Sequence, residues 1–418
     1  MLEPANQFDS YLVGGAVRDA LLGIAVSDRD YVVVGALPED LISQGFEQVG
    51  KDFPCFLHPK TKEEYSLART ERKSGSGYTG FVCEFGPDVG LEEDLRRRDL
   101  TINAMAQSDD GQLIDPFGGQ RDLQEKWLRH VSPAFDEDPL RVLRVARFAA
   151  RFAHLGFRVH PDTLALMAKI AAGGELQTLT TERVWKETSR ALSEISPSIY
   201  FKVLRDCHAL AVLFPEIDAL FGVPQRAEYH PEVDTGVHVL LCIDHARQHF
   251  NDLQVTYAVL LHDLGKGITP EDELPKHLGH EETGVPLVKA VNQRLKVPKD
   301  YAALAELVCR YHLQCHRLGE LRPGTVLKLI ESLDGLRRPE RVELFTQACQ
   351  ADAQGRLGFE NQAYPQAQRL IDCVSAAKAV DVKPLLEKGY QGKALVEPLK
   401  QARIKAVAQV LASKETDH

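Results

Sequence analysis

The spacing of apolar residues changes near residue 136, and this change limits the folds open to the chain. Before that point, short β-branched runs such as Tyr31–Val34 alternate with glycine-rich turns, a pattern typical of buried strands. After it, Leu, Val, Ala and Phe recur at helical spacing to the C-terminus, with breaks at Pro and Gly. Since 418 residues exceed one compact core, we predict an α+β protein with a mixed head and a long helical body.

Composition excludes several other classes of protein. No apolar run is long enough to cross a bilayer, and the first one, from 11 to 26, is interrupted by Arg18 and Asp19, unlike a signal peptide. The eight cysteines form no CxxC pair, so we expect free thiols and a cytoplasmic protein. The net charge of −10 disfavours general nucleic-acid binding, but arginines cluster at 96–98 and 141–151.

A glycine pair, Gly14-Gly15, precedes a predicted short helix over 16–22 that ends at Gly23. Glycines between a strand and a helix let the backbone approach a phosphate, and the helix N-terminus then faces the anion. Arg18 adds a cation one turn into this helix. A Gly-Gly pair alone is weak evidence, because most such pairs are ordinary turns.

Two carboxylates, Asp28 and Asp30, come directly before the predicted strand at 31–34. In an extended chain, residues i and i+2 point to the same face. Two carboxylates on one face repel unless they share a cation, and magnesium with a bound triphosphate suits them. An isolated DxD is more often a solvated turn, so its meaning depends on the neighbouring motifs.

A third feature, three consecutive arginines ending in Arg98-Asp99, precedes an apolar segment that contains Asn103. In this order and spacing, the three features resemble the class II tRNA nucleotidyltransferase and bacterial poly(A) polymerase family of the DNA polymerase beta superfamily. The resemblance covers roughly residues 11 to 190. It implies that Asp28 and Asp30 bind catalytic magnesium and that Gly15, Arg18 and Arg98 contact the nucleotide. It also implies a third carboxylate, for which Glu64 and Glu71 are both candidates.

A predicted helix opens at Glu137-Asp138-Pro139 and carries a basic face. Arg141, Arg144, Arg147 and Arg151 fall within an arc of about 120°. Without an anion they would repel each other, which favours a triphosphate or polyanion partner. By the same resemblance, Asp138 and Arg141 pair with the Watson–Crick edge of C or A, and Arg144 and Arg147 reach phosphate or orient that pair. The segment 181–183 resembles a supporting motif.

A second constellation follows in the helical body. His238 is followed by the adjacent pair His262-Asp263, and Asp352 lies far downstream. This pattern resembles the all-helical HD phosphohydrolase superfamily. The resemblance implies a metal site made by the following residues: His238, His262, Asp263 and Asp352.

Asp352 is the least secure of these ligands. His280 and His312 are alternatives or ligands of a second ion, and we expect His277 and His316 at the surface. Imidazole with carboxylate suits nickel, manganese, cobalt or iron better than magnesium alone, and the metal would activate water against a phosphoester.

Such a pairing of domains is typical of CCA-adding enzymes of the gammaproteobacterial type, which also act as phosphatase, 2′-nucleotidase and 2′,3′-cyclic phosphodiesterase. We therefore expect tRNA as partner and CTP and ATP as substrates, with Mg²⁺ in the head, a transition metal such as Ni²⁺ in the HD domain, no membrane, and a monomer or homodimer. The expected parts are a head (1–136), a neck (137–222), an HD domain (223–355) and a helical tail (356–418).

Three alternatives remain open. A poly(A) polymerase shares the head motifs, although the HD domain and the lack of a basic tail favour CCA addition. A CC-adding or A-adding specialist is less expected, because a glycine- and serine-rich loop at 72–80 is present. An HD-domain regulator or RNA-binding protein with an inactive head is a third alternative, and the following residues argue against it: Asp28, Asp30, Asp138 and Arg141.

Overall fold

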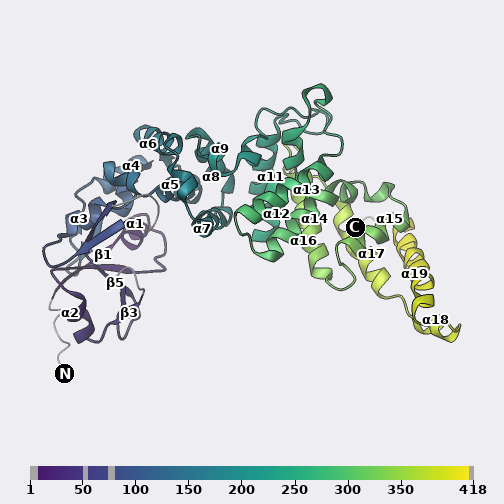
Figure 1. The fold of residues 1–418 in the computed structure, drawn as a ribbon, viewed down its shortest axis with the longest axis horizontal. Coiled ribbons are helices and arrows are strands. Elements are labelled where there is room, and N and C mark those ends of the chain that lie inside the picture. The colour runs from purple at the N-terminus through teal and green to yellow at the C-terminus, as the bar shows by residue number, and fades with distance from the viewer. Residues whose placement is uncertain (1–7, 50–54, 74–80, 414–418) are drawn as a thin grey trace. The chain divides into compact units, whose positions relative to one another are not determined.

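The computed structural model describes residues 8–49, 55–73 and 81–413. The chain forms two compact units, each considered by itself (Figure 1). The first comprises residues 1–188 and 199–213, and the second comprises residues 189–198 and 214–418. The finer division at residues 136, 222 and 355 stays a prediction. Most of the loop predicted at 72–80 lies outside the described residues.

A seven-stranded sheet forms the head, in the order β3-β4-β5-β2-β1-β8-β9. Strand β2 is parallel to β5 and antiparallel to β1, and its register places Asp30 beside Glu64. Two smaller sheets pair β6 with β7 and β10 with β11. The strands are β1 Asp9–Val13, β2 Asp30–Val34, β3 Glu47–Val49, β4 Cys55–Leu57, β5 Glu64–Leu67, β6 Arg69–Lys73, β7 Phe81–Phe85, β8 Ala106–Ser108, β9 Leu113–Ile114, β10 Trp127–Leu128 and β11 Arg158–Val159.

Successive residues of β2 point to opposite faces of the sheet. Apolar side chains pack against both of these faces. Val32 packs into one cluster with Val13 and Leu95, whereas Val33 packs into another with Leu41 and Phe56. The predicted strand at 31–34 is therefore confirmed as a buried central strand. Asp30 stands at its first position, at the end of the sheet where β1 leads into α1.

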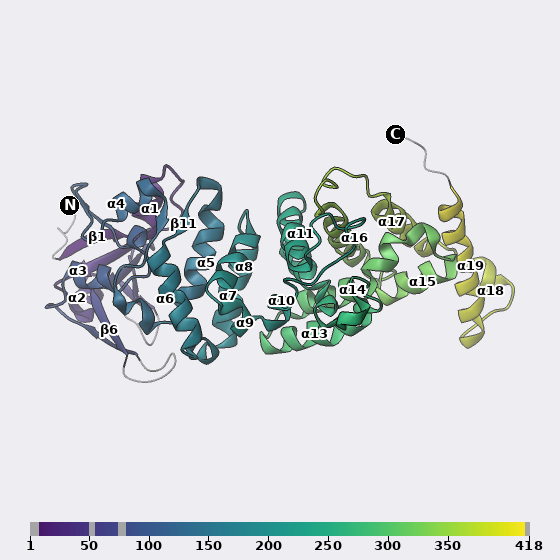
Figure 2. The same cartoon turned by 90° about the horizontal axis from the view of Figure 1, so that it is seen from above.

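Of the helices of the first unit, α1 to α4 lie around the strands of the sheet, and α5 to α9 lie beyond it (Figure 2). They are α1 Gly15–Leu21, α2 Pro38–Ser43, α3 Leu91–Arg96, α4 Gly119–Glu125, α5 Leu140–Phe152, α6 Pro161–Ala172, α7 Thr181–Leu192, α8 Pro197–Asp206 and α9 Ala209–Leu213. Helix α5 is buried on nearly all sides, and only Arg144 and Arg151 are partly exposed. The predicted basic face is therefore largely buried against other elements, for a reason that its ion pairs give below.

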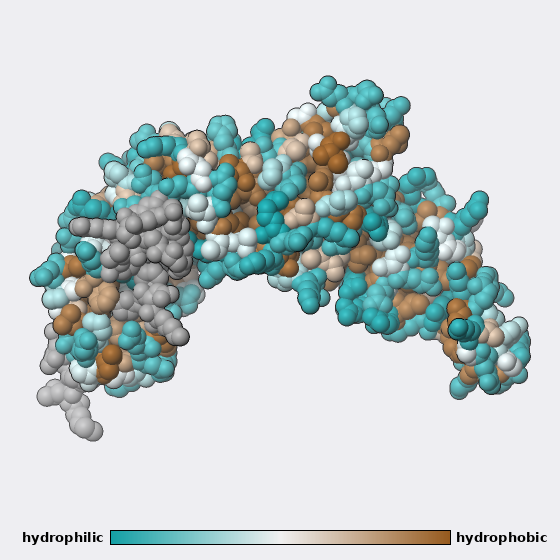
Figure 3. Space-filling view, viewed as in Figure 1, coloured by the Kyte–Doolittle hydropathy of each residue, from teal (hydrophilic) through white to brown (hydrophobic). Residues whose placement is uncertain are grey.

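The second unit is helical. Its helices are α10 Pro215–Asp218, α11 Thr235–His249, α12 Leu253–Leu261, α13 His280–Arg294, α14 Lys299–His316, α15 Pro323–Ser332, α16 Pro339–Gln354, α17 Pro365–Lys378, α18 Lys383–Glu387 and α19 Lys393–Ala412. The apolar helix α12 is central and packs against α11, α14 and α16. Apolar and polar residues are interspersed on the visible surface (Figure 3). Among the described helices, none is long and apolar enough to cross a membrane.

Candidate functional sites

The glycine pair forms a tight turn between β1 and α1. Gly14 has φ +67°, which favours glycine, and its N–H donates to the carbonyl of Met105 at 3.1 Å. A Cβ at Gly14 would lie only 2.7 Å from Arg98 Nη1. The turn therefore brings the backbone, the start of α1 and an arginine to one place, as a phosphate site requires.

Arg18 is buried rather than projecting into solvent. Its Nε donates to Asp19 Oδ1 at 2.7 Å, its Nη1 donates to Asn103, and its guanidinium stacks over Phe152. Burial lowers the pKa of Arg18, with Asp19 opposing that effect. Arg18 thus fixes the turn through Asn103, which connects the first and third sequence features.

Arg98 is held by an acid on its own helical turn. Its Nη2 donates to Asp94 Oδ2 at 3.1 Å, its Nη1 donates to the carbonyl of Asn103 at 3.4 Å, and its buried Nε has no hydrogen-bond partner among the described residues. Asp94 is fully buried on α3 and also binds Arg97. Arg98 therefore lies beside Gly14 with donor capacity to spare.

The carboxylates of Asp28 and Asp30 lie at the exposed end of β2. Although Asp30 as a residue is exposed, desolvation of its carboxyl group raises its pKa, and Glu64 and Asp28 raise it further while Arg98 lowers it. A bound cation would relieve this mutual repulsion, and oxygen ligands of this kind suit Mg²⁺. Glu71 lies on β6, in register with Cys83 of β7, and these two strands form a sheet separate from that of Asp30. The register therefore favours Glu64 over Glu71 as the third carboxylate.

The arginines of α5 are paired with groups from distant segments. Arg144 binds Asp99 at 2.8 Å, Arg147 binds Glu187 at 2.6 Å and Arg151 binds Asp19 at 3.1 Å. Arg141 donates to the carbonyls of Ala134 and Arg97. The expectation that these arginines need an external anion is therefore wrong in physical terms, because the protein supplies acids and carbonyls itself. Their nucleotide-binding role stays a prediction.

Asp138 lies just before α5 and is oriented from two sides. Its Oδ1 accepts from the N–H of Leu140 at 3.0 Å, and its Oδ2 accepts from Arg183 at 2.9 Å. Arg183 belongs to the 181–183 motif, so the structure brings that motif to Asp138. A carboxylate held in this way has a fixed orientation and keeps acceptor positions for further hydrogen bonds.

The four residues predicted for the HD site lie close together in the second unit. Each comes from a different helix, helix end or turn. His238 lies on α11, His262 caps α12, Asp263 opens the turn Leu264–Ile268, and Asp352 lies on α16. His238 Nε2 is 3.1 Å from Asp352 Oδ1, and His262 Nε2 is 3.1 Å from Asp263 Oδ2. All four side chains are buried. The distant Asp352, the least secure prediction, therefore lies with the other three.

Both histidines present Nε2 to the carboxylates, because Nδ1 is engaged elsewhere. His262 Nδ1 is 2.6 Å from the carbonyl of Val259, and His238 Nδ1 is 2.8 Å from Glu232 Oε1. Partners of this kind orient metal-binding imidazoles. Among the described residues, none makes a well-oriented hydrogen bond to either Asp263 oxygen, although Lys266 Nζ lies 2.6 Å from Oδ2. Buried acceptors in this state fit a metal ion.

Electrostatics also indicate a place for positive charge. Burial opposes the ionised forms, yet the neighbouring imidazoles and Lys266 hold the pKa of Asp263 well below its usual range, and His262 and other histidines do the same for Asp352. Burial lowers the pKa of His262, but Asp263 and Asp352 more than offset this and raise it to about 10. The ionised forms of these two buried carboxylates are therefore stabilised by the positive charge around them.

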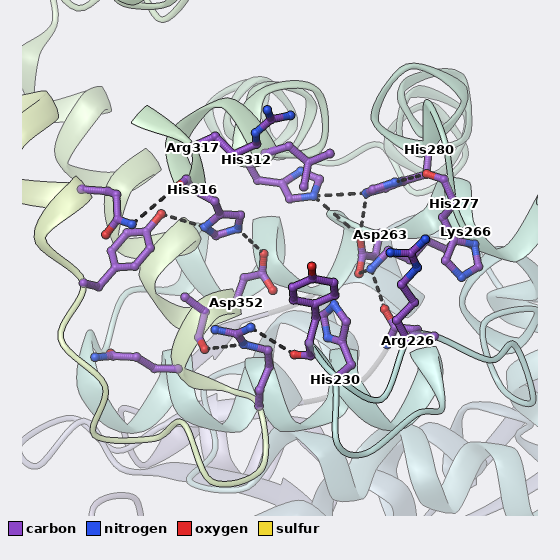
Figure 4. Close-up of a pocket in the computed structure, with 18 of the residues that line it drawn as sticks. Arg226, His230, Asp263, Lys266, His277, His280, His312, His316, Arg317 and Asp352 are labelled. Atoms are coloured by element: carbon purple, nitrogen blue, oxygen red, sulfur yellow. Dashed lines mark hydrogen bonds and ion pairs between the residues drawn. The ribbon is translucent and has the colours of Figure 1, made fainter. Parts of the chain in front are cut away.

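An open pocket leads to Asp263 and Asp352 (Figure 4). Its wall includes basic side chains at Arg226, Lys276 and Arg356, and the exposed apolar side chains Tyr229 and Leu278. A pocket with a buried metal-binding floor and basic walls suits a phosphate ester.

His277 and His316 line this pocket, so their expected surface position is only partly right. His316 Nε2 is 2.7 Å from Asp352 Oδ2, and its Nδ1 is 2.9 Å from the hydroxyl of Tyr364. His277 contacts Thr269 and the carbonyl of Pro224 instead. His316 therefore orients Asp352, whereas His277 belongs to the pocket wall alone.

Sequence reasoning missed several residues that hold these sites. Lys266 stands three positions after Asp263, and Asp94 stands three and four positions before Arg97 and Arg98, so helical spacing was an available signal for both. Glu187 and Glu232 gave no such signal, because only the fold brings them to Arg147 and His238.

Comparison with known proteins identifies the domains that contain these residues. Three family models match: the Poly A polymerase head domain over residues 10–129, "Probable RNA and SrmB- binding site of polymerase A" over 156–221, and the HD domain over 235–353. The expected polymerase-type head and HD domain are therefore confirmed.

Relatives match almost the whole chain. The multifunctional CCA proteins of Hahella chejuensis and Pseudomonas fluorescens are 59% and 60% identical over 397 residues, which is 95% of this chain and 94% and 97% of theirs. A CCA-adding enzyme in complex with ATP has a TM-score of 0.64 at 22% identity, covering 96% of this chain and 86% of its own. A Thermotoga maritima CCA-adding enzyme complexed with tRNA has a TM-score of 0.63 at 22% identity, covering 98% and 92%. These structures share the fold.

Proposed function

Because this chain belongs to the multifunctional CCA proteins, it is a nucleotidyltransferase, and we propose that it adds the 3′-terminal CCA of tRNA from CTP and ATP without a nucleic-acid template. The observation that carries the proposal is the arrangement at the end of β2, with Asp28 and Asp30 in front of the Gly14 turn and Arg98. Glu64, in register with Asp30, completes the set of acids.

In this reaction the 3′-hydroxyl of tRNA attacks the α-phosphorus of the nucleotide, and pyrophosphate leaves. Asp28, Asp30 and Glu64 would hold magnesium, which supplies charge neutralisation and a nucleophile at neutral pH. Gly15 at the start of α1 presents backbone N–H groups to the triphosphate. Arg98 contributes positive charge beside this turn, and Arg18 fixes the turn through its hydrogen bond to Asn103.

The choice of base is assigned to Asp138 and Arg141. Cytosine and adenine both carry an exocyclic amine beside a ring-nitrogen acceptor, so an acceptor from Asp138 and a donor from Arg141 can pair with either. The ion pair of Asp138 with Arg183 supports this role, because it orients the carboxylate. Arg141 donates one N–H of each Nη to a carbonyl, which leaves further N–H donors of its guanidinium for the base. Arg144 and Arg147 set the position of α5 through Asp99 and Glu187.

Asp138→Ala tests this assignment. It should lower kcat/KM for both CTP and ATP and relax discrimination against UTP, because the wrong base no longer leaves the acceptor of Asp138 unpaired. Unchanged discrimination in a folded Asp138→Ala protein would refute the assignment.

The product distinguishes CCA addition from poly(A) synthesis. Purified protein given tRNA without CCA, together with CTP and ATP, should add three nucleotides and stop, and each nucleotide omitted in turn should stop addition at its own position. The relatives are named for CCA rather than for poly(A), which does not favour a poly(A) polymerase. A long A tract would overturn the proposal.

In the HD domain we assign a phosphohydrolase reaction on 2′,3′-cyclic, 2′- and other phosphate esters, with the metal on His238, His262, Asp263 and Asp352. The buried acceptors of Asp263 support this site. The domain implies a divalent metal, and Ni²⁺ is the expected ion because imidazole ligands suit it. Asp263→Ala should remove hydrolysis of a cyclic phosphate while nucleotide addition continues. Loss of both activities together, or of neither, would contradict two separate sites.

Two further expectations complete the proposal. tRNA processing places the protein in the cytoplasm, and a monomer or a homodimer is the expected state. Mass photometry of the purified full chain, with and without tRNA, measures the latter.

A further inference from the structure

A basic groove lies on the second unit, separate from the pocket that leads to Asp263. Three cationic side chains line it: Lys289 on α13, Arg310 on α14 and Arg341 on α16. Its volume of about 370 Å³ lies within the range of small-molecule pockets. The chain as a whole has a net charge of −10, so the overall charge does not account for a groove of this kind.

Helix α14 presents different faces to the groove and to the pocket. Its residues at 303, 306, 307 and 310 recur at helical spacing on one face and line the groove. His312 and His316 lie on another face of the same helix and line the pocket. Among the described residues, none lines both, so the groove is a separate feature of this unit.

Two of the three cations are only weakly neutralised by the protein. Lys289 Nζ lies 3.7 Å from Glu306 Oε2, and Arg310 Nη2 lies 3.3 Å from Glu282 Oε2. Solvent reaches both pairs, so each contributes little. Arg310 Nε is buried and has no hydrogen-bond partner among the described residues. Arg310 therefore keeps a donor that the protein does not use.

Arg341 is half-buried, and among the described residues no carboxylate lies within ion-pair distance of its guanidinium. Burial removes part of the hydration of a cation, so an anion that enters the groove would stabilise it. The arginines of α5 differ in this respect, because Arg144 and Arg147 are paired with acids of the protein. Arg341 is thus the cation of the groove with the most to gain from a ligand.

The other residues of the groove suit a sugar beside the anion. Val285 and Leu307 supply apolar surface, and Tyr311 and Ser332 carry hydroxyl groups. Guanidinium groups bind phosphate through forked, charge-assisted hydrogen bonds. Donors that come from three helices suit the tetrahedral oxygens of a phosphate better than a flat carboxylate. A ribose phosphate combines the anion with a sugar.

We propose that the basic groove binds a ribose phosphate. The phosphate lies on Lys289, Arg310 and Arg341, and the sugar lies against Val285 and Leu307. A free mononucleotide and the backbone of RNA both contain this group, so two probes distinguish these sources. The groove goes beyond the nucleotide addition and the hydrolysis proposed above, because it lies outside both sites.

Binding of two probes by the full chain tests the proposal. The groove variant carries Lys289→Gln and Arg341→Gln. The matched control carries Arg322→Gln and Lys328→Gln, which remove the same charge from exposed positions that do not line the groove. The probes are tRNA lacking CCA, followed by fluorescence anisotropy, and labelled AMP, followed by equilibrium dialysis. CTP and ATP are left out, so the result does not depend on nucleotide addition.

We expect the groove variant to bind at least one probe about tenfold more weakly than the control does. Weaker binding of tRNA alone, with a salt dependence that is shallower by about one, assigns the groove to the RNA backbone. Weaker binding of AMP alone assigns it to a free nucleotide, and weaker binding of both assigns it to the ribose phosphate that they share. Equal binding of both probes by the groove variant and the control would overturn the proposal.

Circular dichroism checks that both variants fold. If the groove variant does not fold, Arg341→Gln alone takes its place, with Lys328→Gln as its control. Arg341 has no carboxylate partner to lose among the described residues, so its replacement should leave the fold intact. The same outcomes then decide between the two sources and against the groove.

Discussion

The head and the HD site handle charge in opposite ways. In the head, the arginines of α5 are paired with acids or carbonyls of the protein, while Asp28 and Asp30 lie exposed at a sheet end. In the HD domain, carboxylates and imidazoles are buried, and both Asp263 oxygens lack well-oriented donors among the described residues. Exposed carboxylates suit a metal that arrives together with a triphosphate, whereas buried carboxylates and imidazoles suit a divalent metal held within the domain.

The largest expected effect is the loss of nucleotide addition without a change in phosphate-ester hydrolysis. Asp28→Ala removes a metal ligand worth several kcal/mol of transition-state stabilisation, so nucleotide addition should fall by about a thousandfold or more. Hydrolysis of a 2′,3′-cyclic phosphate should be unchanged, because Asp28 belongs to the other unit. Incorporation and hydrolysis are measured on one preparation. Retained incorporation would refute the site assignment.

The second largest expected effect is that different metals restore the two reactions after metal removal. After a chelator and rapid desalting, added Mg²⁺ should restore nucleotide addition at once, because exposed carboxylates bind it with the nucleotide. Hydrolysis should recover only with a transition metal such as Ni²⁺, because the buried imidazoles need a softer ion. Both rates are followed against each metal. If Mg²⁺ alone restores both reactions fully, the contrast in metal chemistry is lost.

The ion pair between Glu187 and Arg147 allows the stability contributed by a buried ion pair to be compared with that of an exposed one. Glu187→Gln leaves Arg147 buried without its counter-ion, at a cost of about 3–5 kcal/mol. Glu92→Gln, which breaks the exposed pair with Arg96, should cost about 0.5 kcal/mol or less. Urea unfolding at constant protein concentration measures both. Equal losses would mean that the buried arginine is not held by Glu187.

The smallest expected effect is a loss of stability of the head at acidic pH. Arg97 and Arg98 more than offset burial and lower the pKa of Asp94. The folded pKa lies below the unfolded value of about 3.9, so this stabilisation is present above that value and is lost as pH falls through the folded pKa. The head should therefore lose stability below about pH 4, and Asp94→Asn should flatten this dependence. The measurement is the thermal midpoint from pH 7 to 3; an unchanged slope contradicts the account.

Local patterns predicted the residues that are neighbours in sequence. The β-branched run before Gly35 predicts β2, whereas Asp28 and Asp30 are predicted as a site only together with Gly14-Gly15 and Arg98-Asp99. The adjacent His262-Asp263 pair likewise marked the HD site. Such features depend on one strand or one turn, whose geometry the sequence specifies directly.

Pairings across the fold were not predictable in this way. The choice between Glu64 and Glu71 depends on the register of β2 and β5, which the sequence of either strand alone leaves open. The basic face of α5 was misjudged because Glu187 and Asp19, its counter-charges, lie on other elements. His316 was placed at the surface because nothing near it in sequence points to Asp352.

A tRNA with a blocked 3′ end tests whether one chain carries two independent metal sites. The substrate is tRNA lacking CCA whose 3′ end is a 2′,3′-cyclic phosphate, so that addition requires prior hydrolysis. The intact protein should convert it to full CCA. Asp28→Ala alone and Asp263→Ala alone should each fail, and an equimolar mixture of the two folded variants should restore conversion. Completion by Asp263→Ala alone, or failure of the mixture, would contradict the account.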